Sequence, residues 1–540
     1  MNFYSYLKHK KKEILISLFF LIIFIIGINV FKDYNIYSDE PFHKWSGSLY
    51  YNFIKEFLTT FNFNNNYFKE IEINLSTEGY KFWFMYPMFF ELFSELFIDL
   101  FNFSGQNSYF FRHFLNFLFF FISIIYLFSL INNRFNNLYF AALSVLILFF
   151  TPIIFSQAFF NTKDILFLSL IIISIFYSKK FLENSSTKNL IIYSIISGIM
   201  LNVRIFGILF IFLTIFLYFL GETNTKNTLI KKIINSLFSL FIIFFIFFLF
   251  FPFLWSSPID NFLFYLNYLL EGVYNVPNLY FSKVYTSKNL PLHYIPVWML
   301  ITLPLPVFLI SLFGLFKIFS NFIARLDYID NSKSLYADKN ELLDFFILFT
   351  FISSFFIAIF GGHNQGTWRY FYFIYPLIIY FTIFALRSIQ KYNMRLFFIT
   401  LVIIIINLSY NISWIVKNHP FQNVSFNFIQ KIIIKKNFEL DFWGNSDKYM
   451  IEHLLKNSDG LIKVSGIGHM WINGTFEIFN DKDKSRLNAV SLYDADFIID
   501  RNSPVYKNQK IRNYIKNNFV SYYSLVVDGK ILNKIYKRKK

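Results

Sequence analysis

Two adjacent carboxylates, Asp39 and Glu40, follow about ten residues after the first strongly apolar run of the chain, at 14–30. Only 33 of the 540 residues are acidic. A carboxylate near the low-dielectric edge of a membrane is costly, and it is useful when it exchanges protons. We therefore consider the pair a candidate catalytic centre, with ordinary solvated loop acids as the alternative.

Further ionisable groups stand where apolar runs begin or end. They are Arg112, His113, Lys163, Asp164, Arg204, His293, His363, Arg369 and Tyr370. Each has a structural alternative, such as an arginine reaching the lipid headgroups or a residue of the interfacial aromatic belt. If all lie near one membrane face, they can converge on one cavity. A carboxylate base with several cations suits displacement of a lipid phosphate: the base takes a proton from an acceptor hydroxyl, and the cations stabilise the departing phosphate.

The sequence gives little support for a metal or nucleotide site of a familiar kind. Cysteine is absent and the eight histidines are scattered, which excludes thiolate zinc sites, iron–sulfur clusters and disulfides. Neither a GxGxxG nor a P-loop motif occurs. The strings Asp481-Lys482-Asp483 and Asp494-Ala495-Asp496 are weak candidates for metal or nucleotide binding. A divalent cation held by the Asp39-Glu40 pair with a lipid phosphate stays open.

The composition indicates a polytopic membrane protein. Hydrophobic residues make up 56% of the chain, aromatic residues 23%, and phenylalanine alone accounts for 81 positions. A soluble protein cannot bury so much apolar surface. The net charge of +17 then points to positive-inside loops and anionic membrane lipids rather than to nucleic acid.

Apolar runs near the spanning length of ~20 residues predict about eleven transmembrane helices. They fall at 14–30, 110–131, 138–159, 165–182, 189–203, 206–220, 233–254, 294–318, 342–360, 371–389 and 396–415. Basic residues precede the first run and recur in alternate loops, which predicts a cytoplasmic N-terminus. Four loops and the tail after about 416 are then expected outside, in the periplasm of a bacterial inner membrane. The loops are 31–109, 160–164, 252–293 and 361–370.

Two outer segments have predicted structure of their own. The loop 31–109 contains the amphipathic stretches WSGSLYYNFIKEFLTTF and YPMFFELFSELFIDLF, which we interpret as helices in the membrane interface. The tail 416–540 is predicted to be a small α/β domain. It has short strands at LIKVSGIG and ADFIID, a helix at SDKYMIEHLLKN and a hairpin around Asp528-Gly529. We thus expect a mainly α transmembrane domain at 1–415 followed by this domain.

The ordered set of these segments resembles a known family. The matching pieces are SDE in the first outer loop, FFRHFLNFLF, PIIFSQAFFNTKDILFLSL, LNVRIFGI, LPLHYIPVWMLITLPLPVFLISLFGL, GGHNQGTWRYFYFIYP, NHPFQNVSFN and FELDFWGNS. They resemble integral-membrane glycosyltransferases of the GT-C fold, most closely bacterial relatives of the dolichyl-phosphate-mannose–protein mannosyltransferases and the aminoarabinose transferases. The similarity spans roughly 30–450.

The resemblance implies an inverting transferase that uses a polyprenyl-phosphate sugar. Asp39 matches the catalytic base and Glu40 the neighbouring acid. Arg204, Arg369, Lys163 and Tyr370 are the implied donor-phosphate residues, and the remaining cavity candidates are Arg112, His113, Asp164, His293 and His363. Eukaryotic protein mannosyltransferases carry a β-trefoil domain between spans, and no outer loop here is long enough for one. The acceptor therefore stays open between glycan, lipid and protein.

The leading hypothesis is thus a polyprenyl-phosphate-dependent glycosyltransferase of the cell envelope, acting at the outer membrane face with membrane lipids around it. The main alternative is a lipid-linked sugar flippase or transporter without transferase activity. It would also use membrane-embedded charges, but is expected to show repeat symmetry and broken midplane helices. A scaffold protein is the third possibility, and it would not need basic residues recurring at one face.

Overall fold

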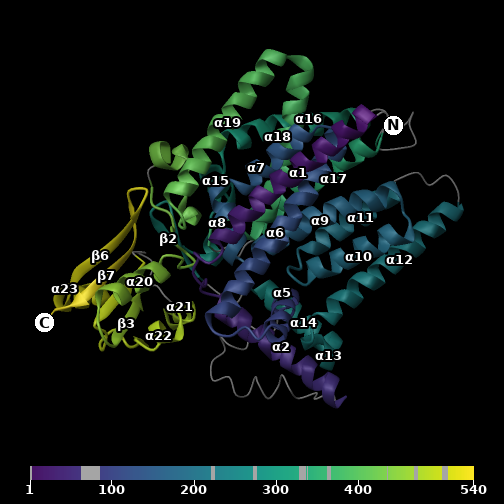
Figure 1. The fold of residues 1–540 in the computed structure, drawn as a ribbon. Coiled ribbons are helices and arrows are strands. Elements are labelled where there is room, and N and C mark those ends of the chain that lie inside the picture. The colour runs from purple at the N-terminus through teal and green to yellow at the C-terminus, as the bar shows by residue number, and fades with distance from the viewer. Residues whose placement is uncertain are drawn as a thin grey trace.

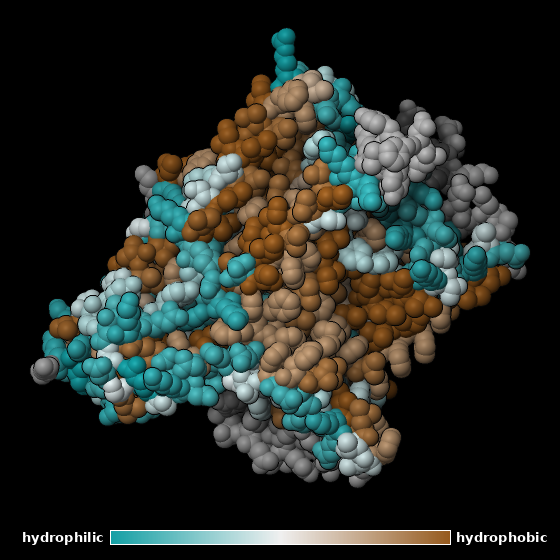
Figure 2. Space-filling view, in the orientation of Figure 1, coloured by the Kyte–Doolittle hydropathy of each residue, from teal (hydrophilic) through white to brown (hydrophobic). Residues whose placement is uncertain are grey.

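The structure is a computed structural model and describes residues 3–61, 86–220, 226–271, 276–326, 336, 338–361, 366–434, 436–467, 472–501 and 509–539. Long helices dominate it, and a small sheet near the C-terminus lies to one side of them (Figure 1). The space-filling view shows hydrophobic residues over much of the helical body and mainly hydrophilic residues over the C-terminal part (Figure 2). This division agrees with a membrane-embedded body that carries a water-exposed domain.

Within the described ranges, eight helices are long and apolar enough to cross a membrane. They belong to α1 (Phe3–Val30), α6 (Gln106–Phe135), α9 (Asp164–Glu183), α12 (Lys226–Leu249), α16 (Leu305–Leu326), α17 (Lys339–Phe360), η3 (Arg369–Ile374) with α18 (Tyr375–Tyr392), and α19 (Met394–Lys417). A ninth span is possible if α7 (Leu138–Phe149) and α8 (Pro152–Phe160) count as one.

The remaining predicted spans are helical but shorter or broken. The helices α7 and α8 bend by 71° at Thr151-Pro152, because proline lacks a backbone N–H and disfavours helical geometry in the preceding residue. The two short apolar helices are α10 (Thr187–Leu201) and α11 (Gly207–Leu220). The run expected at 294–318 divides into α15 (Tyr294–Thr302) and α16 at Leu303-Pro304. All eleven predicted runs therefore have helical counterparts.

Close packing between α1 and α6 positions the end of α1, which precedes the segment that carries Asp39. A Cβ atom at Gly27 would lie 1.9 Å from Cζ of Phe117, so glycine permits this approach of the two helices. Phe117 is fully buried and stacks on Phe159, with ring centroids 5.2 Å apart. The helix α6 also packs against α7, α8 and α9, and so forms the centre of the bundle.

The first outer loop contains both helices expected from its amphipathic sequence. They are α2 (Glu40–Thr60) and α5 (Phe89–Leu100), which pack against each other at one end of the bundle (Figure 1). A Cβ atom at Gly47 would lie 2.7 Å from Cβ of Glu91, so this glycine lets α5 approach α2 closely. The next outer region contains α13 (Phe253–Ser256), α14 (Pro258–Glu271), β1 (Pro277–Tyr280), β2 (Lys283–Thr286) and η2 (Ser287–Asn289).

The C-terminal part forms a five-stranded sheet with the order β4-β3-β5-β7-β6. Strand β3 is parallel to β4 and β5, and β7 is antiparallel to β5 and β6. The predicted hairpin is present, with Asp528 and Gly529 both at positive φ, as a two-residue turn of this kind needs. The elements are α20 (Asp447–Asn457), β3 (Ile462–Ile467), α21 (Ile472–Phe476), α22 (Asp481–Lys484), β4 (Leu487–Ala489), β5 (Phe497–Asp500), α23 (Gln509–Asn518), β6 (Phe519–Val527) and β7 (Lys530–Arg538).

The segment between α19 and α20 packs with the helical body. It contains the short helices η4 (Gln422–Val424) and η5 (Ile429–Ile434). Phe426, Phe438 and Trp443 belong to the same buried core as the membrane helices. The core of the sheet domain in turn includes Ile36 from the first outer loop. The sheet domain therefore packs directly beside the loop that carries Asp39.

Candidate active site

Asp39 occupies the N-cap position of α2 without capping it. Its backbone is helical, at φ −91° and ψ −12°, and its side chain accepts no hydrogen bond from the helix start. In the described part of the chain, its carboxylate has no ion-pair partner. Part of the residue is exposed. Burial of the carboxyl raises its pKa, while the charges of Arg369 and Lys163 oppose the rise. Asp39 is thus a carboxylate available for proton transfer beside two cations.

Glu40 has a different environment although it is the next residue. It is fully buried, and its two carboxylate oxygens lie 3.2 Å from Nε of Arg112 and 3.1 Å from Nε2 of His113. Nη1 of Arg112 also donates a hydrogen bond of 2.8 Å to Ser94. This cluster joins the first turn of α2 to α6 and α5. Arg112 and His113 therefore both bind the carboxylate of Glu40 in the protein interior.

Asp164 brings two of the predicted cations together. Arg204, in the turn between α10 and α11, donates a hydrogen bond to Asp164 through Nη2, and Nη1 of Arg369 lies 3.8 Å from the other carboxylate oxygen. Asn161 holds this carboxylate through a hydrogen bond of 2.9 Å. Because α9 packs against η3, the start of α9 faces Arg369. Two arginines sharing one carboxylate retain a net positive charge.

Aromatic rings surround the two arginines. The guanidinium carbons of Arg204 and Arg369 both lie 4.6 Å from the ring centroid of Tyr370, and Nη2 of Arg369 donates a hydrogen bond of 2.9 Å to its hydroxyl. Arg369 also lies 4.2 Å from the ring centroid of Trp443 and 5.4 Å from that of Phe442. Such rings orient a guanidinium without neutralising its charge.

Lys163 completes the basic side of the site. Its Nζ lies 4.2 Å from the ring centroid of Tyr86. Burial lowers the pKa of Lys163 to about 8, although the charge of Glu91 opposes this. A cavity of about 10 Å³ between Lys163, Glu91 and Asn202 has room for about one water molecule. Lys163 therefore loses its charge more readily than an ordinary lysine.

The chain is similar to one family model and to solved structures. The family model for dolichyl-phosphate-mannose-protein mannosyltransferase matches residues 86–255, about a third of the chain. The crystal structure of apo ArnT from Cupriavidus metallidurans is similar, with a TM-score of 0.52 at 10% identity, over 97% of this chain and 98% of that one. A second ArnT structure from the same organism, bound to undecaprenyl phosphate, gives a TM-score of 0.49 at 9% identity, over 96% of this chain and 97% of that one. No curated protein matches in sequence.

The chain has the GT-C fold. The family match supports a glycosyltransferase as the class of protein, in an integral membrane setting. The matched range contains Arg112, Lys163, Asp164 and Arg204. Asp39 and Arg369 lie outside it.

A loop before α20 also contacts this cluster, although none of its residues was predicted as a site residue. The backbone oxygen of Trp443 accepts hydrogen bonds of 3.3 Å from both the backbone nitrogen and the hydroxyl of Ser38. Asn35 donates a hydrogen bond of 2.8 Å to the backbone oxygen of Gly444. Trp443 therefore contacts the segment before Asp39 with its backbone and Arg369 with its ring. The only sequence signal was the segment FELDFWGNS within the family resemblance.

The sheet domain holds this loop in place. Nη2 of Arg501 lies 2.6 Å from Oδ2 of Asp447 and 3.5 Å from the hydroxyl of Ser38. Gly444 has φ +75°, and a Cβ atom there would lie 1.9 Å from Nη2 of Arg501, so both the backbone conformation and the space require glycine. Arg501 thus links the sheet domain to the residue directly before Asp39.

Not all predicted site residues join this cluster. His293 is exposed, and its Nδ1 lies 2.5 Å from the hydroxyl of Tyr280 in β1. It belongs to the outer region between α14 and α15. His363 lies outside the described residues. The structure therefore brings together Asp39, Lys163, Asp164, Arg204, Arg369 and Tyr370, next to the buried cluster of Glu40, Arg112 and His113.

The residues present do not fit a cation chelated by the Asp39-Glu40 pair. Both oxygens of Glu40 are bound by Arg112 and His113, so its carboxylate does not face a ligand shared with Asp39. Within the described ranges, no group of three or more acidic or histidine side chains could hold a metal ion. In the D-x-D strings, Asp483 bonds to Asn480 and Asp494 to Ser491 within their own turns.

Proposed function

We propose that the chain is an inverting glycosyltransferase that moves a sugar from a polyprenyl-phosphate donor to a hydroxyl acceptor at the outer face of the membrane. The observation that carries this proposal is the contrast between Asp39 and Glu40. Glu40 is bound on both oxygens, whereas Asp39 keeps its carboxylate available beside Lys163 and Arg369. The family match, whose description names a dolichyl-phosphate sugar, supports a lipid-phosphate donor.

In the proposed reaction, Asp39 takes the proton of the acceptor hydroxyl. The acceptor oxygen forms a bond to the anomeric carbon of the sugar. The bond between that carbon and the phosphate oxygen breaks, and its electron pair stays with the lipid phosphate. A single displacement of this kind inverts the anomeric centre. It leaves the proton on Asp39 and the negative charge on the phosphate.

The cations around Asp164 are suited to that charge. Arg204 and Arg369 share one carboxylate, so together they carry about one surplus positive charge, and Lys163 adds a second while it is protonated. Planar guanidinium groups can bind phosphate oxygens with paired hydrogen bonds. Tyr370 contacts both arginines and is expected to keep them aligned.

The test is transfer by purified protein from a panel of polyprenyl-phosphate sugars to hydroxyl acceptors. Asp39→Asn should lower the transfer rate by about 10²–10⁴-fold, the range for loss of a general base, and leave folding and donor binding intact. Asp260→Asn, which changes an exposed acid in α14, serves as the matched control. Full activity of the Asp39 variant would refute its role as base. Movement of the donor across the bilayer without any product would favour the transporter alternative.

The same proposal places the N-terminus in the cytoplasm and the sheet domain in the periplasm. Because the chain has no cysteine, a thiol reagent can label only a cysteine that is introduced by mutation. Labelling of single introduced cysteines therefore shows on which side of the membrane each position lies. A membrane-impermeant maleimide applied to spheroplasts should label Leu461→Cys in the sheet domain. It should not label Tyr139→Cys at the start of α7 until the membrane is opened. Both positions are well exposed. The reverse pattern would invert the proposed topology.

A further inference from the structure

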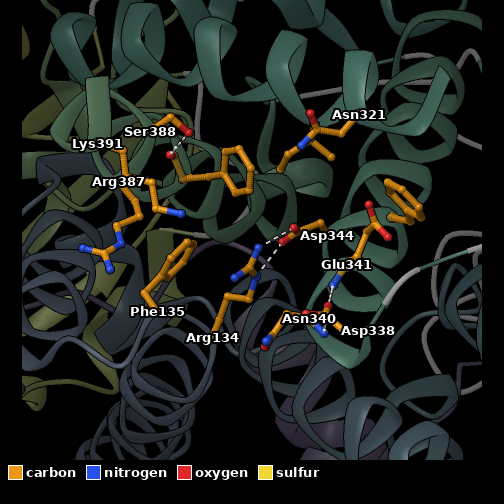
Figure 3. Close-up of a pocket in the computed structure, with 13 residues that line it drawn as sticks. Arg134, Phe135, Asn321, Asp338, Asn340, Glu341, Asp344, Arg387, Ser388 and Lys391 are labelled. Carbon is orange, nitrogen blue, oxygen red and sulfur yellow. Dashed lines mark hydrogen bonds and ion pairs between the residues drawn. The ribbon is translucent and has the colours of Figure 1, made fainter. Parts of the chain in front are cut away.

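A second polar cavity lies at the opposite end of the helices from Asp39. It has a volume of about 380 Å³ (Figure 3), within the range of ~300–1,000 Å³ typical of small-ligand sites. The helix α6 connects the two regions, with Arg112 near its start and Arg134 near its end. At ~1.5 Å per residue, these two arginines are separated by roughly 33 Å along the helix. The cavity therefore lies near the other membrane surface.

The centre of this cavity is an ion pair that is satisfied within the protein. Arg134 donates hydrogen bonds of 2.9 and 2.6 Å to the two carboxylate oxygens of Asp344. Tyr380 donates a further hydrogen bond to the same carboxylate. These groups join the last turn of α6 to the second turn of α17 and to α18. Arg134 and Asp344 line the cavity, and their opposite charges balance each other.

One wall of the cavity is basic. Arg387 and Lys391 stand four residues apart on α18, which places them on one helix face. Nη1 of Arg387 donates a hydrogen bond of 2.7 Å to Gln390, and no described acidic side chain pairs with either cation. Arg387 is half-buried and Lys391 is exposed. Their charges are therefore available to an anionic ligand.

The opposite wall of the cavity carries acidic and amide side chains. Figure 3 shows Asp338, Asn340 and Glu341, from the start of α17, on the far side of the Arg134–Asp344 pair from Arg387 and Lys391. Oδ1 of Asp338 accepts the hydrogen bonds that cap α17, and Glu341 accepts one of 3.0 Å from Arg325. Because Glu341 is paired with Arg325, the carboxylate of Asp338 supplies the negative charge at this end of the cavity. Arg387 and Lys391 supply the positive charge at the other end.

We propose that this cavity binds the headgroup of a zwitterionic aminophospholipid. The phosphate would lie at Arg387 and Lys391, where charge-assisted hydrogen bonds are available. The ammonium group would lie at the acidic wall. The two charges of such a headgroup match the two walls, whereas a purely anionic ligand would face the carboxylates at one end.

The surroundings favour a lipid as the source of this headgroup. The helix α16 contributes the buried Ile318 to the cavity wall, while Phe316 and Phe319 on the same helix are exposed large apolar residues that can face acyl chains. Basic pockets between transmembrane helices on the cytoplasmic side are a known kind of lipid-headgroup site. The loop charges in the sequence predict the cytoplasmic side for this end.

The experiment measures lipid binding to the purified full-length chain by native mass spectrometry in mild detergent. Phosphatidylethanolamine is titrated against wild type, against Arg387→Gln/Lys391→Gln, and against Lys11→Gln/Arg395→Gln. The last variant removes two exposed cations outside the cavity as a matched control. Affinity should fall by about tenfold or more in the cavity variant only. Equal affinity of all three proteins would overturn the proposal. Thermal unfolding confirms that each is folded, and Lys391→Gln alone, at an exposed position, provides a second folded test.

Two further arms define the ligand. Phosphatidylglycerol, which lacks the ammonium group, should bind more weakly than phosphatidylethanolamine. Asp338→Asn, which keeps a side-chain oxygen to cap α17, should reduce that preference. Equal binding of both lipids to wild type would show that the acidic wall does not bind the ammonium group, and would overturn the proposal. Soluble phosphoethanolamine should compete only at far higher concentration than the lipid. If it competes equally well, the cavity binds a soluble aminophosphate and the lipid assignment is wrong. These outcomes do not depend on transferase activity.

Discussion

The indole ring of Trp443 lies against the guanidinium group of Arg369, at 4.2 Å from ring centroid to guanidinium carbon. The two residues come from different parts of the fold. Arg369 begins η3 at the membrane helices, and Trp443 precedes α20 of the sheet domain. The backbone oxygen of Trp443 also accepts the hydrogen bonds of Ser38. One residue therefore connects the proposed phosphate-binding arginine with the loop of the proposed base.

We expect the ring of Trp443 to be needed for the orientation of Arg369. Trp443→Phe keeps an aromatic face, whereas Trp443→Leu keeps apolar bulk without it. The leucine variant should raise the donor KM by roughly 3–30-fold, the equivalent of a cation–π contact of about 0.5–2 kcal/mol. The phenylalanine variant should stay close to wild type. The measurement is initial rate against donor concentration; equal KM values for both variants would show that only the volume of the side chain matters.

Glu40 is expected to act in stability rather than in proton transfer. Glu40→Gln removes the charge that balances the fully buried Arg112, and breaking such a pair costs up to about 3–5 kcal/mol. The variant should unfold at a clearly lower temperature, while Asp39→Asn should not. Thermal unfolding in the same detergent measures this contrast. A stable but inactive Glu40 variant would instead argue for a catalytic role.

The transfer rate should depend on pH through Asp39 and Lys163. Loss of the proton from Asp39 should raise the rate, and loss of the proton from Lys163 should lower it. The pKa of Asp39 is raised by burial, so its base form, and with it the rate, should appear only above the ordinary aspartate value of about 3.9. The pKa of Lys163 is lowered to about 8, so the rate should fall again above that pH as the cation is lost. Single-turnover rates across pH should give a bell-shaped curve. Lys163→Arg should remove the alkaline limb, and an unchanged limb would exclude Lys163 as its source.

The raised pKa of Asp39 also predicts a change in stability. The folded protein binds this proton more tightly than the unfolded chain does. The contribution of Asp39 to the free energy of unfolding is therefore fully present below the unfolded pKa and is lost as pH rises through the folded pKa. Asp39→Asn should flatten this part of the curve of stability against pH. A slope of the same size in both proteins would assign it to other groups.

Asp164 should affect donor binding as well as stability. In Asp164→Asn, Arg204 and Arg369 lose their shared counter-charge and should separate, which destabilises the fold by about 3–5 kcal/mol and raises the donor KM. Asp344→Asn breaks a comparable pair with Arg134 at the other end of the bundle. Both variants should have lower melting temperatures, but only the Asp164 variant should show the change in KM. A KM change in both would indicate a general effect of instability.

Local patterns in the sequence predicted much of the fold. The apolar runs identified the helices because burial in a membrane needs long uninterrupted apolar segments. The Asp528-Gly529 hairpin followed from residues that tolerate positive φ. The break at Pro304 and the 71° bend at Pro152 were not anticipated, although proline was the available signal. A hydropathy pattern counts apolar residues and does not register a missing backbone donor.

The sequence also determined which residues could do chemistry, because isolated charges in apolar surroundings are recognisable without coordinates. Only the tertiary structure decided how those charges pair. Glu40 meets Arg112 across 72 positions of sequence, and Asp164 meets Arg204 across 40, through helix contacts that no local pattern encodes. Trp443 enters the site for the same reason. The energy of such a pair depends on distance and burial, which the packing of α2, α6, α9 and η3 determines. This packing buries the carboxylate of Glu40 against Arg112 and His113, and leaves the carboxylate of Asp39 available.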